Sequence, residues 1–229
     1  MNGRTVKAAT GGALLLATVG LVGSMSGGSA TAVGSAPTDL LEAGTQTRAQ
    51  LTPFNNSGVR GVSEVSVDGR DLDMSVDARR LLRDMPHAQH IHFGAQARNE
   101  CPTVRDDDNS DHRLNTAEGI PAYGPVKVSM TKSGPTGPGS TLAVTRYPTA
   151  PEGQIHYDRQ TTTSERTAEG IRRGDAVVVI HGIDYNHNHK YDFNGAGKSE
   201  LDPALPAEAT DPVACGVLRV QDELPAETP

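Results

Sequence analysis

The chain has no tryptophan, and aromatic residues make up only 3% of its 229 positions. A hydrophobic core must therefore be built from Val, Ile, Leu, Met and Ala. No basic stripe is present and the formal net charge is -7, so nucleic acid is not an expected partner. A serine nucleophile elbow, a His-Glu-x-x-His helix and a glycine-rich phosphate loop are all missing, which gives hydrolase chemistry no support.

Long apolar runs are also scarce, and the N-terminal one predicts a secretory signal peptide. Arg4 and Lys7 precede an apolar segment, residues 8–22, and small residues offer cleavage sites near Ala32 and Ala36. An uncleaved membrane anchor is the alternative. No later stretch is long and apolar enough to span a bilayer. We therefore expect a secreted protein with no stable membrane span after signal removal.

The predicted organisation is a signal peptide with the start of a linker (1–36), a linker (37–50), one β domain (51–221) and a polar tail (222–229). Frequent glycine and proline, 25 and 15 residues, favour a loop-rich all-β chain. Between Asp71 and Ala78, acidic or small polar residues alternate strictly with apolar ones, which indicates a half-buried antiparallel strand. Other apolar patterns predict strands at 59–67, 126–130, 142–144, 155–157, 177–181 and 214–220. One helix is expected over 161–173, with Ser164 as its cap.

Only two cysteines occur, Cys101 and Cys215. Both follow the signal peptide and so reach an oxidising compartment. The simplest interpretation is one disulfide that joins a loop to the last strand. Two free structural thiols are the alternative.

The segment from Pro86 to Gly94 contains His90 and His92, two positions apart. On a strand these imidazoles leave the same face, whereas Ile91 leaves the other. Two imidazoles on a rigid strand are a good start for a transition-metal site. His181 ends the Val-rich run at 177–180, where it is either a capped polar residue or a further ligand.

Four spaced features together resemble the copper/zinc superoxide dismutase-like family. They are His90-Ile91-His92, Cys101, Val178-Val179-Ile180-His181, and Ala214-Cys215-Gly216-Val217-Leu218. The resemblance implies an all-β, Greek-key β-sandwich or barrel with long metal-binding loops and one short helix. It also implies a copper-type site at His90, His92 and His181, and a Cys101–Cys215 disulfide. The chain is interpreted as a secreted bacterial member, and it is also similar to the chordin-type (CHRD) domain.

The chain departs from that family at three places. The bridging histidine of the family falls at Asp107, and the remaining zinc ligands have no match between Asn115 and Tyr123. The arginine that guides superoxide falls at Pro212. These departures imply that the zinc site is lost and that the anion guide is absent.

Two acidic loops match the calcium-loop template instead. The alternating oxygen ligands of the first loop are Asp107, Asn109, Asp111, Asn115 and Glu118. Those of the second loop are Asp184, Asn186, Asn188 and Asp192. His112 and His189 stand where the template has its turn glycine, at some cost in backbone strain. Acidic surface turns, in which Asx residues are common, are the alternative interpretation.

The sequence thus predicts a secreted metal-binding β-sandwich protein with a dismutase-like three-histidine site and two candidate calcium loops. The alternative is a copper-dependent superoxide dismutase. Copper and calcium are the candidate cofactors, metal ions are the expected partners, and the sequence identifies no protein partner.

Overall fold

The computed structural model describes residues 44–221. The predicted signal peptide and the predicted polar tail lie outside the described residues. Across residues 44–221, no helix combines the length and the apolar composition that a membrane crossing requires.

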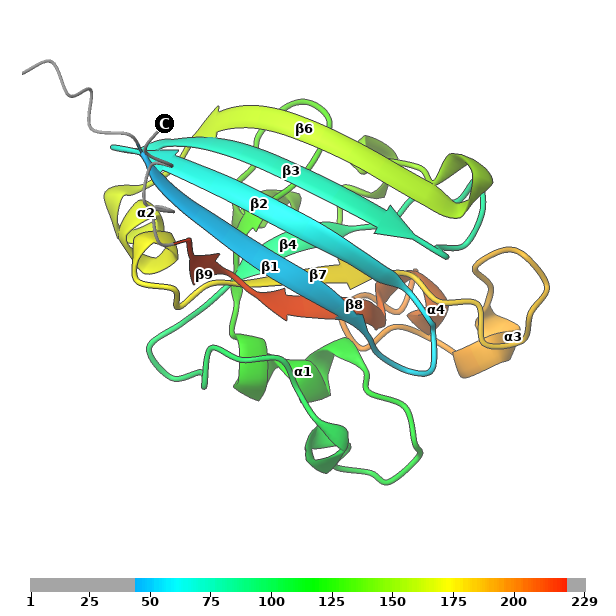
Figure 1. Ribbon diagram of the computed structural model, residues 1–229. Coiled ribbons are helices and arrows are strands. Elements are labelled where there is room, and N and C mark those ends of the chain that lie inside the picture. Colours follow the sequence, from blue (N-terminus) through cyan, green and yellow to red (C-terminus); the bar gives the residue numbers. More distant parts are fainter. Residues whose placement is uncertain (1–43, 222–229) are drawn as a thin grey trace, which may run out of the picture. The chain divides into compact units, whose positions relative to one another are not determined.

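The described residues form nine strands that pair into one antiparallel sheet (Figure 1). The strands are β1 (Thr45–Pro53), β2 (Arg60–Asp68), β3 (Asp71–Arg79), β4 (Gln89–His92), β5 (Val126–Ser129), β6 (Gln154–Thr162), β7 (Val177–His181), β8 (Pro212–Val217) and β9 (Arg219–Val220). Their order is β5-β4-β7-β8-β1-β2-β3-β6, and β9 pairs with β1.

The sheet folds over on itself into two layers. In Figure 1, β1, β2, β3 and β6 lie side by side in one layer, and β4, β7 and β8 lie in the other. The layers join where Thr52 and Pro53 of β1 pair with Cys215 and Ala214 of β8. Strand β6 returns to lie beside β3, and β7 returns to lie beside β4, which is Greek-key connectivity. The predicted all-β sandwich is therefore confirmed.

Strand β3 confirms the alternation seen in the sequence. Leu72, Met74, Val76 and Ala78 are buried in the core between the layers, and the acidic residues of the strand are exposed. The turn before β3 uses Gly69 at φ +53°, a left-handed conformation that glycine adopts at little cost. One face of this strand therefore builds the core and the other is solvated.

Strand β7 differs because all five of its residues are buried. Val178 and Ile180 belong to the core between the layers, whereas Val177 and Val179 pack in a second cluster with Tyr123. This second cluster lies on the outer face of the β5-β4-β7-β8 layer. The long β4–β5 connection, which supplies Tyr123, covers that face. The outer face of this layer is therefore also buried, and it carries the candidate site.

Four α-helices occur in the described part of the chain. They are α1 (Thr116–Tyr123), α2 (Glu165–Arg172), and the single turns α3 (Phe193–Ala196) and α4 (Ala207–Thr210). Helix α2 is the predicted one, and the side chain of Ser164 caps it by accepting from the Thr167 N–H. The expectation of a single helix is too low, because α1 begins within the first predicted calcium loop. The strand expected at 142–144 is wrong, since these residues form short turns.

Strand β1 begins at Thr45, inside the range that the sequence analysis assigned to a linker. Its inward-facing residues are Thr47, Ala49 and Leu51, all buried. Threonine and alanine give only weak apolar alternation, and this explains why the strand is hard to recognise from sequence.

The disulfide Cys101–Cys215 forms, in agreement with the prediction, and it joins positions 114 residues apart. Cys215 is fully buried in the second cluster beside Val179. The bond therefore ties the β4–β5 connection to the outer face of β8.

Replacing both cysteines, Cys101→Ala with Cys215→Ala, should lower the free energy of unfolding by about 4–5 kcal/mol. A disulfide that closes a loop of this length removes that much chain entropy from the unfolded state. Urea denaturation of the oxidised wild type and of the variant measures the difference. Reducing agent should destabilise only the wild type, and a variant as stable as the oxidised wild type would contradict this prediction.

Candidate metal centre

Strands β4 and β7 bring three histidines together on the outer face. His90 and His92 leave β4 on the same side because they are two residues apart. The antiparallel register places His90 opposite Val179 and Gln89 opposite Ile180. The backbone N–H of His181 donates to the carbonyl of Ala88 at 2.8 Å, which extends this pairing to the end of β7. One nitrogen from each ring lies within 4.8 Å of the others.

Each imidazole uses one nitrogen to bond a neighbouring group and leaves the other unpartnered. His92 Nδ1 donates to the Gly124 carbonyl at 2.8 Å, and His181 Nδ1 donates to the Thr210 carbonyl at 2.6 Å. His90 Nε2 lies 2.7 Å from the Tyr147 hydroxyl. The remaining atoms, His90 Nδ1, His92 Nε2 and His181 Nε2, are buried without a hydrogen-bond partner. The bonded N–H fixes each tautomer and leaves three lone pairs.

Burial keeps these imidazoles uncharged. Desolvation is the main cause, and it lowers the pKa of His92 to about 3, that of His181 to about 4, and that of His90 well below its ordinary value. A positive charge on His181 would also repel one on His90 or His92, which lowers their pKa further. Neutral imidazole is the form that binds metals.

Two tyrosines hold the rings in place. The Tyr123 ring centroid lies 4.6 Å from that of His92, and the Tyr147 ring meets His90 edge-on at 5.4 Å. The Tyr147 hydroxyl donates a hydrogen bond to the Ser140 carbonyl at 2.9 Å. The hydroxyl oxygen can therefore accept a hydrogen bond from His90. Burial raises the pKa of Tyr147 to about 12, so the hydroxyl stays protonated. Neither tyrosine was identified from the sequence.

A pocket of about 260 Å³ opens above the three rings. We call it the histidine pocket. The three histidines lie at its floor, and its walls come from α1, from the 138–144 segment and from the β7–β8 connection. Within residues 44–221, none of the residues that line it is Asp, Glu, Lys or Arg.

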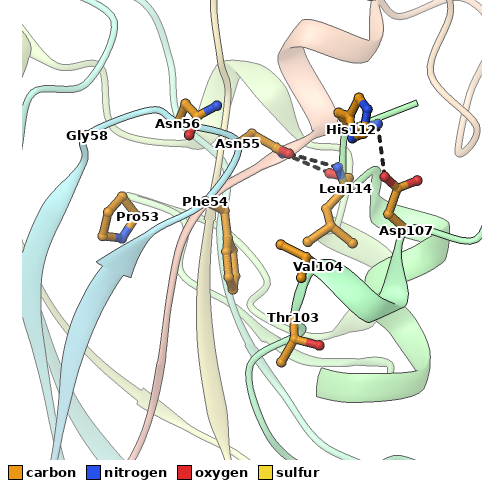
Figure 2. Close-up of a pocket in the computed structure, with 10 residues that line it drawn as sticks. All are labelled: Pro53, Phe54, Asn55, Asn56, Gly58, Thr103, Val104, Asp107, His112 and Leu114. Atoms are coloured by element: carbon orange, nitrogen blue, oxygen red, sulfur yellow. Dashed lines mark hydrogen bonds between the residues drawn. The ribbon is translucent and has the colours of Figure 1, made fainter. Parts of the chain in front are cut away.

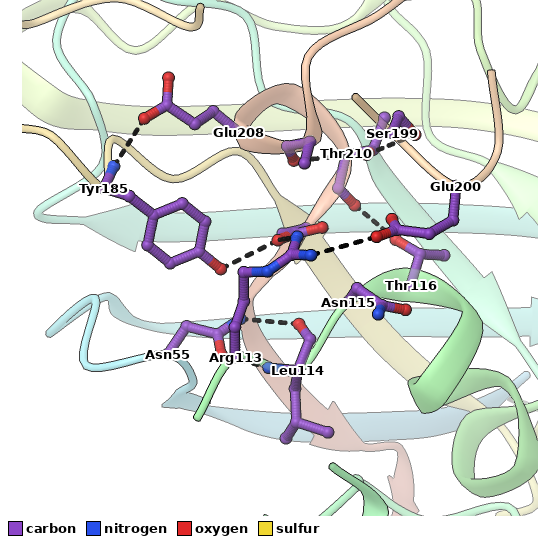
Figure 3. A network of polar contacts seen from close by, with 12 residues as sticks. Asn55, Arg113, Leu114, Asn115, Thr116, Tyr185, Ser199, Glu200, Glu208 and Thr210 are labelled. Carbon is purple, nitrogen blue, oxygen red and sulfur yellow. Dashed lines mark hydrogen bonds and ion pairs between the residues drawn. The ribbon is translucent and has the colours of Figure 1, made fainter. Parts of the chain in front are cut away.

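Figure 3 shows a polar network around Arg113 and Thr210. The Thr210 carbonyl in this network is the one that orients His181. Arg113 contacts the carboxylate of Asp211 at 2.7 Å, and the Tyr185 hydroxyl donates to the same oxygen at 2.9 Å. Thr210 is the residue before Asp211. Its carbonyl accepts hydrogen bonds from the Thr116 hydroxyl and from His181 Nδ1. The network therefore joins both long connections behind the site.

The two acidic loops share one hydrogen-bond pattern. The Asp107 carboxylate accepts from the N–H groups of Asp111 and His112, and the Asp184 carboxylate accepts from those of Asn188 and His189. His112 and His189 take left-handed φ values of +65° and +68°. They occupy the position predicted for a turn glycine.

The loops differ in what closes them. Asn115 and Glu118 form the capping box of α1, each side chain accepting from the backbone of the other at 3.0 Å. These two predicted ligands are therefore used to start a helix. In the second loop, the Asp192 carboxylate accepts from the amides of both Asn186 and Asn188. Hydrogen bonds, the backbone N–H of Asn194 first, lower the pKa of Asp192 to about 2.

A larger groove of about 820 Å³ lies elsewhere, between the β1–β2 turn and the 103–114 segment (Figure 2). The Asn55 side chain crosses this region and bonds both the N–H and the carbonyl of Leu114, at 2.8 and 2.9 Å. The groove contains none of the three clustered histidines. It marks where the first acidic loop is attached to the sheet.

No family model matches the chain, and no curated protein matches it. The chain is similar to a solved structure of Candida albicans superoxide dismutase 5 with Cu(II), at 16% identity and a TM-score of 0.41, covering 81% of this chain and 99% of that one. A structure of a single-residue variant of the same protein matches at 15% identity and a TM-score of 0.40, covering 80% and 94%. Similarity to the CHRD domain stays a prediction.

Asp211 should make stability depend on pH. Burial raises the pKa of its carboxyl to about 7, above the value of about 4 in an unfolded chain. The folded state therefore holds this proton more tightly, and the contribution of Asp211 to stability falls by roughly 1.4 kcal/mol per unit as pH rises from about 4 to 7.

Asp211→Asn removes this titration. The free energy of unfolding of the wild type, minus that of the variant, should decrease across the same pH window. Urea denaturation at several pH values measures it, and Asp158→Asn, at an exposed carboxylate, serves as the control. A wild-type-minus-variant difference that stays constant from pH 4 to pH 7 would refute the assignment.

Proposed function

We propose that this protein binds a copper ion through His90, His92 and His181. The main support is that one nitrogen of each ring lies within 4.8 Å of the other two, and that each ring has one buried nitrogen without a hydrogen-bond partner. Leaving such atoms unsatisfied costs free energy, and one metal ion satisfies all three. Imidazole ligands suit copper and zinc, and Cu(II) generally binds such sites most tightly among the divalent first-row metals.

The surrounding groups support a metal site rather than a chance cluster. Carbonyls of Gly124 and Thr210 hold the second nitrogens of His92 and His181, so both rings are oriented before a metal arrives. Copper, when bound, would supply a redox-active Lewis acid at the floor of the histidine pocket. The protein's own part is to orient the three ligands and to shield them with Tyr123 and Tyr147.

The alternative function is dismutation, in which two superoxide anions and two protons give dioxygen and hydrogen peroxide. The three-imidazole donor set is what favours it. Two observations place it second. Pro212, which pairs with His181, brings no charge to the site. Charged side chains are also missing from the described lining of the pocket. The predicted loss of the zinc site stays a prediction.

The variant His92→Ala should bind copper roughly 100-fold more weakly or worse, because changes around a metal ligand already cost 10–100-fold. Copper content after dialysis and the nitrogen hyperfine pattern of the Cu(II) spectrum measure the effect. His156→Ala, at an exposed histidine on β6, is the matched control and should bind like the wild type.

Unchanged copper stoichiometry in a folded His92→Ala protein would contradict the proposal that His92 is a copper ligand. Inhibition of a superoxide-driven dye reduction by the same copper-loaded wild type would favour the dismutase alternative. No inhibition would leave the metal-binding function standing alone.

We also propose that the acidic loops bind calcium, with the second loop as the better site. Its support is the Asp192 carboxylate, which gathers with Asn186 and Asn188 and so adds a charged oxygen to those of Asp184. Calcium prefers six to eight oxygen ligands of this kind. The first loop offers fewer, because Asn115 and Glu118 cap α1.

Calcium should raise the thermal midpoint of the wild type, and the double variant Asp107→Asn/Asp184→Asn should lose this effect. Asparagine keeps an acceptor oxygen for the loop N–H groups but removes the charge that attracts the cation. Saturation to 100 times Kd would add about 2.7 kcal/mol of stability. The double variant Asp68→Asn/Asp158→Asn removes as much charge from exposed positions. An equal calcium response in both double variants would count against calcium loops.

Secretion is part of the proposal, and the Cys101–Cys215 bond supports it. Disulfides persist in oxidising compartments and are rare in a reducing cytosol.

A further inference from the structure

We propose that the histidine pocket of the metal-free protein admits an uncharged single-ring molecule of the phenol class, and that it disfavours anions of the same size. The inference rests on the proposed function in one respect, because the same three imidazoles form the pocket floor. It goes beyond that function by naming the ligand that the pocket selects.

The mouth of the pocket is the first observation. Three of the six large hydrophobic side chains that are exposed in the described residues line this one pocket. They are Ile120, Leu142 and Leu201, with 41%, 37% and 38% of their surface exposed. They come from α1, from the segment between β5 and β6, and from the β7–β8 connection. Scattered apolar residues are normal on a surface, but three that converge from separate segments on one opening indicate a binding site.

The size of the pocket sets the size of the ligand. Its volume is about 260 Å³. Pockets for drug-sized molecules start at about 300 Å³, whereas an apolar cavity of about 150 Å³ already binds benzene. A single ring with one small substituent fits this range.

The lining sets the charge of the ligand. Within residues 44–221 it includes no Asp, Glu, Lys or Arg, its three histidines are uncharged, and Pro125, Pro138 and Val144 add to the apolar walls. An anion that enters would lose its hydration without gaining a partner charge from the walls, which is costly. A neutral molecule avoids this cost and buries its ring against the apolar mouth.

The floor sets the polar group. His90 Nδ1, His92 Nε2 and His181 Nε2 are buried acceptors without a donor. A hydroxyl on the ring donates its single proton to one of these nitrogens. In the metal-free protein, a phenol therefore pairs its ring with the apolar walls and its hydroxyl with one nitrogen of the floor.

Isothermal titration of the metal-free full chain with 4-methylphenol and with benzoate tests the inference without relying on copper. We expect 4-methylphenol to bind at least tenfold more tightly than benzoate. Leu201→Lys places a cation at the mouth. It should lower the affinity for 4-methylphenol at least fivefold and reduce the ratio of that affinity to the affinity for benzoate. Val220→Lys is the matched control, because Val220 is 43% exposed on β9 and does not line the pocket.

Equal or tighter binding of benzoate by the wild type would overturn the inference, as would equal effects of Leu201→Lys and Val220→Lys in folded proteins. Leu142→Lys is the second mouth variant if Leu201→Lys does not fold. Copper binding without binding of 4-methylphenol would refute this inference alone. Binding of 4-methylphenol without copper binding would refute the proposed function alone.

Discussion

The pairing of β4 with β7 is the constraint on which the rest of this structure depends. Side chains alternate along a strand, so a register shift of one residue would exchange the two faces. In the observed register, Ile91 and Val178 enter the core, while His90 and His92 turn outward to meet His181. The core and the candidate metal centre are opposite faces of the same two strands. The apolar contacts that fix the register therefore also set the geometry of the three histidines.

The outer face becomes an interior only because the long connections cover it. The β4–β5 connection supplies the Gly124 carbonyl and Tyr123, and the β7–β8 connection supplies the Thr210 carbonyl. Each connection is tied down at a distance from the histidines, by the disulfide at Cys101 and by the contact of Arg113 with Asp211. Contacts that stabilise the loops thus also orient the imidazoles. A change at such a tie is expected to alter metal affinity together with stability.

Strict periodicity made part of this structure predictable. Strand β3 and the His-x-His pair of β4 each carry a strong alternating signal, and two cysteines allow only one intramolecular pairing. Helix α1 was missed because its cap, Asn115 with Glu118, lies in an acidic run and Pro121 lies inside the helix. The carbonyl acceptors could not be foreseen, because every residue has a carbonyl and only the fold selects which ones meet a histidine. The apolar mouth was equally hidden, since its residues are far apart in sequence.

The distribution of charge explains why a neutral ligand suits this site better than an anion. The chain carries a formal net charge of -7, and the carboxylates of β3 point to solvent on the layer away from the histidines. That excess charge repels anions at long range, although salt screens it over about 8 Å. Nearer the site, the described pocket lining contains no Lys or Arg. Pro212, which pairs with His181, is also uncharged. In the metal-free protein, both the distant and the local electrostatics therefore oppose an anion, whereas neither opposes an uncharged ring, and the apolar walls attract it.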